Sequence, residues 1–137
     1  GRILGVALLN RRPPGLLEYL RYCRPLFGYM RFDRLVRFFS FTEAADSVVR
    51  KASDFQWFLT VIAVDPEFQH RGIGRLFLER GIEGYIRSHG GGCLAFITCT
   101  PRNAHFYSSA GYRIVGEHSV ALDGNDVPVW SFEKVIE

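Results

Sequence analysis

Apolar residues recur along this chain with two different spacings, which predicts a protein built from both strands and helices. Continuous apolar runs rich in β-branched residues, such as 59–64, are typical of buried strands. Residues 73–86 instead place their apolar side chains on one helical stripe, and a run of glycines soon after them ends the helix. This reasoning predicts strands at 1–10, 54–64, 93–97, 112–122 and 127–135, and helices at 16–26, 30–39, 41–52, 72–88 and 103–109.

Residues with cap and turn preferences mark three of the expected boundaries. Ser40 followed by Glu43 fits a capping box, so we expect a new helix to begin there. Gly5 is a candidate β-bulge in the first strand. Asp123-Gly124-Asn125-Asp126 is a turn signal, which predicts that the last two strands form a hairpin.

The stretch 58–77 contains the first motif with chemical meaning. Its apolar run ends at Asp65-Pro66, and the turn Gln69-His70-Arg71-Gly72-Ile73-Gly74 leads into a helix, with Arg75 just beyond. The first N–H groups of a helix have no acceptor within it, and glycines permit close backbone approach, so this order of elements suits a phosphate group. The sequence fits neither a P-loop nor the dinucleotide fingerprint. A two-glycine turn also serves to pack a helix against a sheet, and that alternative stays open.

A second motif spans residues 98–112, with the sequence TCTPRNAHFYSSAGY. Pro101 interrupts the pattern of the preceding strand, and Asn103 to Ser109 has the spacing of a short helix that ends before Gly111. The motif therefore places a short helix directly after a buried strand.

Together the two motifs resemble those of the GNAT superfamily of acyl-CoA N-acyltransferases. The glycine turn of that family has the form [Arg/Gln]-x-x-Gly-x-[Gly/Ala], which corresponds here to Gln69, Gly72 and Gly74. The later family motif has the form Asn-x-x-Phe-Tyr-x-x-x-Gly-[Phe/Tyr]. It corresponds here to Asn103, Phe106, Tyr107, Gly111 and Tyr112.

The resemblance covers roughly residues 54–137, and the order of features is similar to the puromycin-acetyltransferase-like branch. In that layout a helical insertion, here about 14–53, precedes the strand that carries the cofactor. Family members usually place a further strand and one or two helices before the first strand seen here. We expect those elements to be absent from this chain, which opens with Gly1, and their absence would expose an edge of the sheet. A neighbouring copy could cover that edge, which leaves a homodimer open.

The resemblance implies one α/β (α+β) domain over residues 1–137, with a mixed, mostly antiparallel central sheet flanked by helices. It also implies acetyl-CoA as the cofactor, with its pyrophosphate at the glycine turn and its pantetheine arm along the preceding strand. The implied cofactor-binding residues are Ile62, Ala63, Val64, Gln69, His70, Arg71, Gly72, Ile73, Gly74, Arg75, Asn103 and Phe106.

Tyr107 is implied as the catalytic acid that protonates the leaving thiolate. A phenol with a pKa of about 10 can protonate a thiolate whose conjugate acid has a pKa of about 8.5 or above. The alternative is that Tyr107 is a core aromatic residue beside Phe106. Asn103 resembles the family Asn that hydrogen-bonds the cofactor arm, and its alternative role is to cap the short helix.

The general base is not identified by the resemblance. Family members often carry a Glu where this chain has Thr60, which cannot act as a base. Glu117, His118, His105, Asp54 and Glu43 remain candidates, and a chain of water molecules is the alternative.

Composition agrees with one globular domain, since 47% of residues are hydrophobic and 23% are charged. The net charge of +3 suits a ligand with several phosphates but is too small to indicate nucleic acid. Three cysteines in no zinc spacing predict no metal site and a cytoplasmic, reducing setting, with Cys93 and Cys99 buried as small apolar residues. No apolar run has the length of a membrane span, so we expect no membrane partner.

The segment 16–41 interleaves arginines with leucines and aromatic residues. We expect two amphipathic helices with a solvated basic face and an apolar face on the sheet. The alternatives are a lid over the acceptor site, a surface for an acidic partner, or a membrane-surface helix, which Pro25 and Gly28 would interrupt. The arginines concerned are Arg21, Arg24, Arg31, Arg34 and Arg37.

These expectations lead to one principal hypothesis and two alternatives. The principal hypothesis is an N-acetyltransferase that moves the acetyl group of acetyl-CoA to the primary amine of a small molecule, or of a protein, by direct attack. The first alternative is a non-catalytic acyl-CoA-binding or regulatory module, and the second is a purely structural subunit that binds no CoA.

Overall fold

The computed structural model describes residues 1–22, 24–29 and 31–137. The predictions that involve Cys23 and Met30 lie outside these residues. The elements are β1 (Gly5–Asn10), α1 (Leu16–Tyr22), η1 (Arg24–Gly28), α2 (Phe32–Ala52), β2 (Trp57–Val64), η2 (Pro66–Phe68), α3 (Ile73–Leu76), η3 (Phe77–Ile82), α4 (Glu83–Ser88), β3 (Gly92–Thr98), α5 (Pro101–Ser109), β4 (Arg113–Leu122) and β5 (Asn125–Ile136).

Within the described residues the strands form one five-stranded sheet in the order β1-β2-β3-β5-β4. β2 and β3 are parallel, and every other neighbouring pair is antiparallel. This confirms the predicted mixed, mostly antiparallel sheet. β1 lies at one edge of the sheet, and the prediction that another copy covers this edge stays a prediction.

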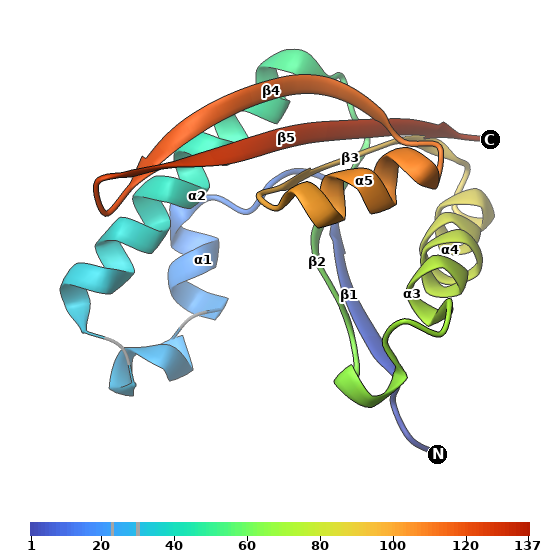
Figure 1. Cartoon of the computed structure of the whole chain (residues 1–137), viewed down its shortest axis with the longest axis horizontal. Coiled ribbons are helices and arrows are strands. Elements are labelled where there is room, and N and C mark those ends of the chain that lie inside the picture. The colour runs from blue at the N-terminus through green and yellow to red at the C-terminus, as the bar shows by residue number, and fades with distance from the viewer. Residues whose placement is uncertain (23, 30) are drawn as a thin grey trace.

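The parallel pair of strands opens into a wedge. β2 and β3 pair only at Trp57↔Leu94 and Phe58↔Ala95, near the start of both strands. Beyond these residues the two strands diverge, with β2 running down beside β1 while β3 stays beside β5 (Figure 1). The wedge leaves one edge of residues 59–64 without a partner strand among the described residues.

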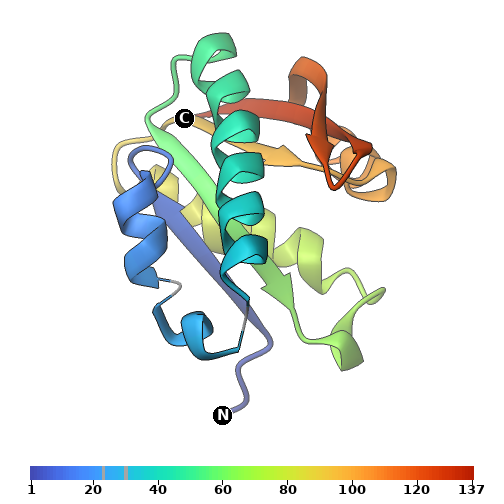
Figure 2. The ribbon, with the colours of Figure 1, turned by 90° about the vertical axis from the view of Figure 1, so that its left-hand side faces the viewer.

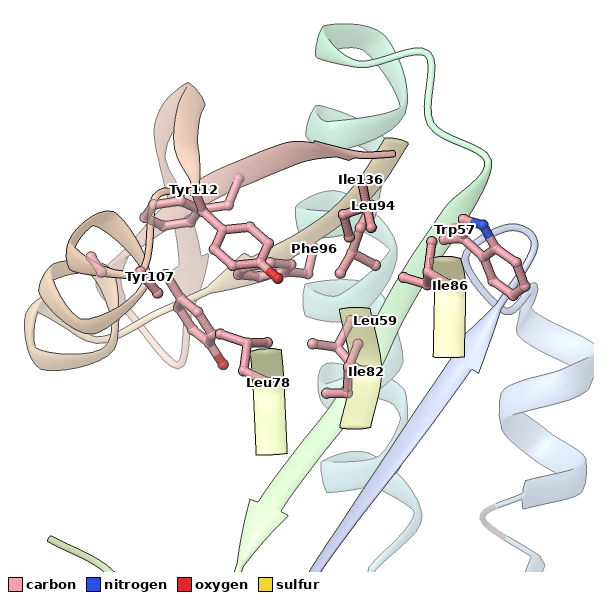
Figure 3. Packing of buried hydrophobic residues seen from close by; sticks show 13 residues of the cluster. Trp57, Leu59, Leu78, Ile82, Ile86, Leu94, Phe96, Tyr107, Tyr112 and Ile136 are labelled. Carbon is pink, nitrogen blue, oxygen red and sulfur yellow. The ribbon is translucent and has the colours of Figure 1, made fainter. Parts of the chain in front are cut away.

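Helices cover both faces of the sheet. α1 and α2 lie on one face, and the continuous helix formed by α3, η3 and α4 lies on the other (Figures 1 and 2). The larger apolar core packs this second helix and α5 against the sheet, through Leu78, Ile82, Phe96 and Tyr107 among others (Figure 3). A smaller core under α2 contains Val49, Phe58 and Ala95. No helix in the described part of the chain combines the length and the apolar character that crossing a membrane requires.

The predicted break between two helices at Ser40 is wrong, because α2 runs without interruption from Phe32 to Ala52. Its sequence contains no glycine or proline, so nothing in the backbone favours a break. Glu43 does not reach back to cap a helix but pairs with Arg50, at 2.6 Å between Oε1 and Nη2. The buried residues Leu35 and Val49 anchor both halves of the helix.

The predicted bulge at Gly5 is also wrong. Gly5 pairs in register with Val64, and the irregularity in this pair of strands lies between Leu8 and Leu9. Leu8 faces Val61 while Leu9 faces Leu59, so the extra residue is Thr60 of β2. A Cβ on Gly5 would lie 3.2 Å from the Phe77 ring, so this glycine serves close packing rather than a bulge.

The predicted hairpin between the last two strands is present with a shorter turn. The strands pair up to Leu122↔Asn125, so only Asp123 and Gly124 form the turn. Both have positive φ, 51° and 78°, as a two-residue type I′ turn requires.

Candidate functional site

A cavity of about 510 Å³ lies where β2 ends, between the following turn and α5. Its volume falls within the roughly 300–1,000 Å³ typical of small-molecule sites. Eleven of the thirteen residues that the sequence nominates for the site line this cavity. The lining residues are Ile62, Ala63, Val64, Gln69, His70, Gly72, Gly74, Arg75, Arg102, Asn103, Phe106 and Tyr107.

The turn between β2 and α3 is shaped by two residues in the left-handed region. His70 has φ of 61° and Gly72 has φ of 77°. Gln69 fixes the start of this turn, because its Nε2 donates to the carbonyl oxygen of Val64 at 2.9 Å. The turn therefore brings the beginning of α3 to the end of β2.

Gly72 precedes the first turn of the long helix, and no side chain caps this helix end. The first N–H groups of the helix have no acceptor within it, so they are free to bind an anionic group. A Cβ built on Gly72 meets no atom within 4 Å. The space beside this glycine is therefore open for a ligand to approach the backbone.

Two arginines line this cavity, and they differ in their hydrogen-bond partners. Arg75 donates from Nε to Glu79 at 2.8 Å and from Nη2 to the carbonyl oxygen of Ser109 at 3.2 Å, which joins α3 to the end of α5. Arg102, which the sequence reasoning missed, lines the cavity, and its Nη2 lies 3.1 Å from the His70 ring. Its position next to Asn103 in the second motif was the available signal.

Two nominated residues do not line the cavity. Arg71 places its guanidinium 5.6 Å from the centre of the Phe68 ring. Ile73 is half-buried at the start of α3. Neither residue lines this cavity or the second cavity, which is described next.

A second cavity of about 260 Å³ fills the wedge between β2 and β3. It shares Ile62, Asn103 and Tyr107 with the first, so the two spaces meet at these residues. Its remaining lining residues are Leu59, Thr60, Val61, Phe96, Ile97 and Thr98. A ligand held at the turn can thus extend along the open edge of β2 into the wedge.

Tyr107 is a buried aromatic residue that also lines both cavities. Its ring packs 4.4 Å from that of Phe96, and the residue is only 7% exposed. Figure 3 shows it within the apolar cluster. Its hydroxyl has no hydrogen-bond partner among the described residues, and the side chain lines both cavities. Burial raises the pKa of the phenol, so the hydroxyl stays protonated well above neutral pH.

Asn103 is not the cap of its helix. α5 begins at Pro101, and the Thr100 hydroxyl caps it by accepting from the Asn103 backbone N–H at 3.3 Å. Asn103 lies in the first turn and lines both cavities. Its amide is therefore available for a ligand.

None of the five residues considered as a general base lines either cavity. Glu43 is paired with Arg50 on α2, and the others are exposed at the surface. Thr60 does line the wedge, and its Oγ1 accepts a hydrogen bond from Asn10 at 2.7 Å. The wedge therefore contains hydroxyl and amide groups, but no carboxylate or imidazole is among its lining residues.

Cys93 and Cys99 are half-buried rather than buried as predicted. Cys93 lies within β3, with its sulfur 3.8 Å from the Ser53 hydroxyl. Burial raises the pKa of both thiols, which disfavours the reactive thiolate. Neither cysteine lines the two cavities.

A family model described as the acetyltransferase (GNAT) domain matches residues 28–114. Among solved structures, the ribosomal-protein-S18-alanine N-acetyltransferase from Escherichia coli is similar with 22% identity and a TM-score of 0.51, over 61% of this chain and 59% of that chain. A mutant agmatine N-acetyltransferase in its apo form is similar with 17% identity and a TM-score of 0.60, over 98% of this chain and 72% of that one. An aminoglycoside 6′-N-acetyltransferase complexed with coenzyme A has 21% identity and a TM-score of 0.50, over 59% of each chain. At these identities the structures show a shared fold, and the chain spans only 59% of the length of the first of them.

Proposed function

Because the chain belongs to the GNAT acetyltransferase family, we propose that it transfers the acetyl group of acetyl-CoA to a primary amine. The observation that carries this proposal is the position of Tyr107. Its proton-bearing side chain reaches the place where the turn cavity meets the wedge between β2 and β3. An acyl donor held at the turn would present its reacting end there.

The residues around the two cavities suit acetyl-CoA. The open backbone at Gly72 and the uncapped start of α3 would hold the pyrophosphate, with Arg75 and Arg102 as nearby cations. The edge of β2 that faces the wedge would pair with the pantetheine amides as an added strand does. Ile62, Ala63 and Val64 supply that edge.

Acetyl-CoA would supply an acetyl group activated as a thioester, and this chain would supply the groups around it. A backbone N–H on the open edge of β2 would donate to the carbonyl oxygen. Tyr107 would give its Oη proton to the departing sulfur. We propose direct attack by the amine, since the lining residues include no cysteine or serine that would carry an acyl group.

The acceptor in this proposal is a small-molecule amine, with a protein amine as the alternative of the same class. The similar structures include enzymes named for agmatine, for aminoglycosides and for the alanine of a ribosomal protein. These names give a first panel of acceptors for assay: agmatine, an aminoglycoside and a peptide with an N-terminal alanine.

A second candidate is a non-catalytic acyl-CoA-binding module. It is favoured by one observation, that none of the nominated bases lines the cavities. The two candidates share the binding site and differ in turnover, so both the binding of acetyl-CoA and the transfer of its acetyl group must be measured.

Binding is tested by isothermal titration of the chain with acetyl-CoA. We expect micromolar affinity that weakens at least tenfold in Gly72→Val, because the new side chain fills the space beside the turn. Gly124→Val is the matched control, since Gly124 also has a positive φ of 78°, a Cβ there also meets nothing within 4 Å, and Gly124 lines neither cavity. Absence of binding by the natural chain would contradict both candidates and favour a structural subunit.

Turnover is tested by following CoA release with the acceptor panel. Tyr107→Phe removes only the hydroxyl and is expected to lower kcat by about 10²–10³-fold while the affinity for acetyl-CoA is kept. No release of CoA with any acceptor despite tight binding of acetyl-CoA would favour the binding module.

A further inference from the structure

Thr60 occupies an irregular position of β2 at the wall of the wedge. It is the extra residue of the bulge between β1 and β2, because Leu8 and Leu9 face Val61 and Leu59. Bulges often re-aim a side chain beside an active site. Here the bulged residue lines the cavity that contains Tyr107.

Asn10 fixes the orientation of the Thr60 hydroxyl. Its Nδ2 donates to Thr60 Oγ1 at 2.7 Å, across the two strands and 50 residues apart in sequence, at a half-buried position. An amide nitrogen only donates, so it occupies one of the two lone pairs of the hydroxyl oxygen. The remaining lone pair and the hydroxyl proton stay available, on a side chain that lines the wedge.

We propose that the Asn10–Thr60 pair orients the acceptor amine for attack, an inference that rests on the proposed acetyltransferase function. Thr60 Oγ1 accepts one N–H of the neutral amine, which turns the nitrogen lone pair toward the carbonyl carbon. Thr60 touches the substrate, and Asn10 acts through Thr60 as a positioning residue. Such orientation lowers the entropic part of the barrier without any change in the charge of the site.

Acetyl transfer requires no proton transfer to or from Thr60. The amine nitrogen forms a bond to the carbonyl carbon, and the bond between that carbon and sulfur breaks. The sulfur takes the Tyr107 Oη proton, and the nitrogen loses one proton to water. That proton then restores the Tyr107 phenol, so the products are an amide and free CoA.

The test compares variants of the full chain with acetyl-CoA and the panel amine that the natural chain acetylates fastest. Thr60→Val keeps the shape but removes the hydroxyl, and kcat is expected to fall about 10–100-fold with little change in the KM for acetyl-CoA. Thr60→Ser restores the hydroxyl and is expected to stay within about threefold of the natural kcat. Thr42→Val, at a half-buried position of α2 that lines neither cavity, is the control for an unrelated threonine.

A double-mutant cycle separates positioning from a structural role. Asn10→Ala is expected to lower kcat less than Thr60→Val does, and the double variant is expected to be no slower than Thr60→Val alone. A Thr60→Val chain with the natural kcat, or multiplicative effects in the double variant, would overturn this inference alone. A natural chain that binds acetyl-CoA but acetylates no amine would overturn the proposed function and this inference with it.

Discussion

Gly72 and Gly74 stand two residues apart where the turn meets α3, but only the first has a backbone conformation that favours glycine. Gly72 has a positive φ of 77°, which L-residues adopt at a cost. Gly74 lies within α3, and a Cβ there would meet Phe106 and Val64 at 3.9 Å, an ordinary contact. The family pattern, which accepts Gly or Ala at the second position, therefore has a steric explanation.

The first prediction follows from this difference. Gly72→Ala should destabilise the fold by about 1–2 kcal/mol, because alanine is strained in the left-handed region. Gly74→Ala should leave the free energy of unfolding within about 0.5 kcal/mol of the natural value, because the helix favours alanine. Urea denaturation of both variants measures the difference, and equal losses in the two would contradict it.

Burial of two tyrosines gives the second prediction, a loss of stability at alkaline pH. Burial raises the pKa of Tyr107, and burial together with the charge of Glu83 raises that of Tyr112. Above about pH 10 the unfolded chain releases phenol protons that the native chain retains. The contribution of the two protonated phenols to the free energy of unfolding is therefore complete below about pH 10. It is lost as the pH rises toward their raised native pKa values.

Urea denaturation between pH 8 and 11 would measure this loss. In Tyr107→Phe the free energy of unfolding should fall less steeply above about pH 10, by up to about 1.4 kcal/mol per pH unit. The comparison is between slopes, so a constant offset from the lost hydroxyl does not affect it. Parallel curves for the natural and variant chains would show that this tyrosine does not titrate as argued.

At the scale of elements, the helix from residue 73 to 88 departs from regular α geometry over η3, which is a π-helical segment. The Phe77 ring lies between two glycines of different elements. A Cβ on Gly81 would lie 2.6 Å from Phe77 Cδ2, and one on Gly5 of β1 would lie 3.2 Å from Cδ1. The absence of both Cβ atoms lets the helix pack closely on the edge strand.

The third prediction contrasts two glycines of this helix. Gly81→Ala should destabilise the protein by about 1–3 kcal/mol, because the Phe77 ring must move in a packed site. Gly84→Ala should stabilise it by about 0.5–1 kcal/mol, because a Cβ there meets nothing and alanine favours the helix. Thermal unfolding of the two variants provides the measurement. A gain in Tm for Gly81→Ala would show that Phe77 does not restrict this position.

At the scale of the whole molecule, one buried carboxylate joins the helical layer to the sheet. Glu83 of α4 is 2% exposed, and its Oε1 accepts from the Tyr112 hydroxyl and from Lys134 Nζ, both at 2.9 Å. Arg87 contributes a third contact to Oε2 at 3.1 Å. Tyr112 immediately precedes β4 and Lys134 lies in β5, so the network connects three elements far apart in sequence.

The fourth prediction is that this network matters far more than a surface pair on the same helix. Glu83→Ala should cost about 3–5 kcal/mol, because it leaves Lys134 and the Tyr112 hydroxyl without their partner. Glu79→Ala removes the Arg75–Glu79 pair, in which the Glu79 side chain is 44% exposed, and should cost at most about 1 kcal/mol. Chemical denaturation at neutral pH compares the two. Similar losses of unfolding free energy in the two variants would show that the contacts of Glu83 stabilise the protein no more than a surface ion pair does.

Much of the fold and of the candidate site followed from the sequence because the information is local. Strand β2, the turn to Gly74 and the first turn of α5 are each specified by residues adjacent in the chain. Their φ preferences, caps and apolar spacing depend on near neighbours alone. The GNAT family and the mixed sheet were therefore correct from sequence, and most of the nominated residues line one cavity.

What the sequence alone could not decide depends on contacts between distant segments. The bulge at Thr60 is defined by the pairing of β2 with β1, and the Asn10–Thr60 hydrogen bond joins residues 50 positions apart. Arg102 lines the cavity beside His70, 32 residues away in sequence, and the Phe77 ring packs where both Gly5 and Gly81 lack a Cβ. The sequence determined the elements and the motif residues, because backbone preference and periodicity act within a few residues. Only the tertiary structure decided register, the wedge and its polar lining, because these arise when remote side chains compete for the same space and the same hydrogen bonds.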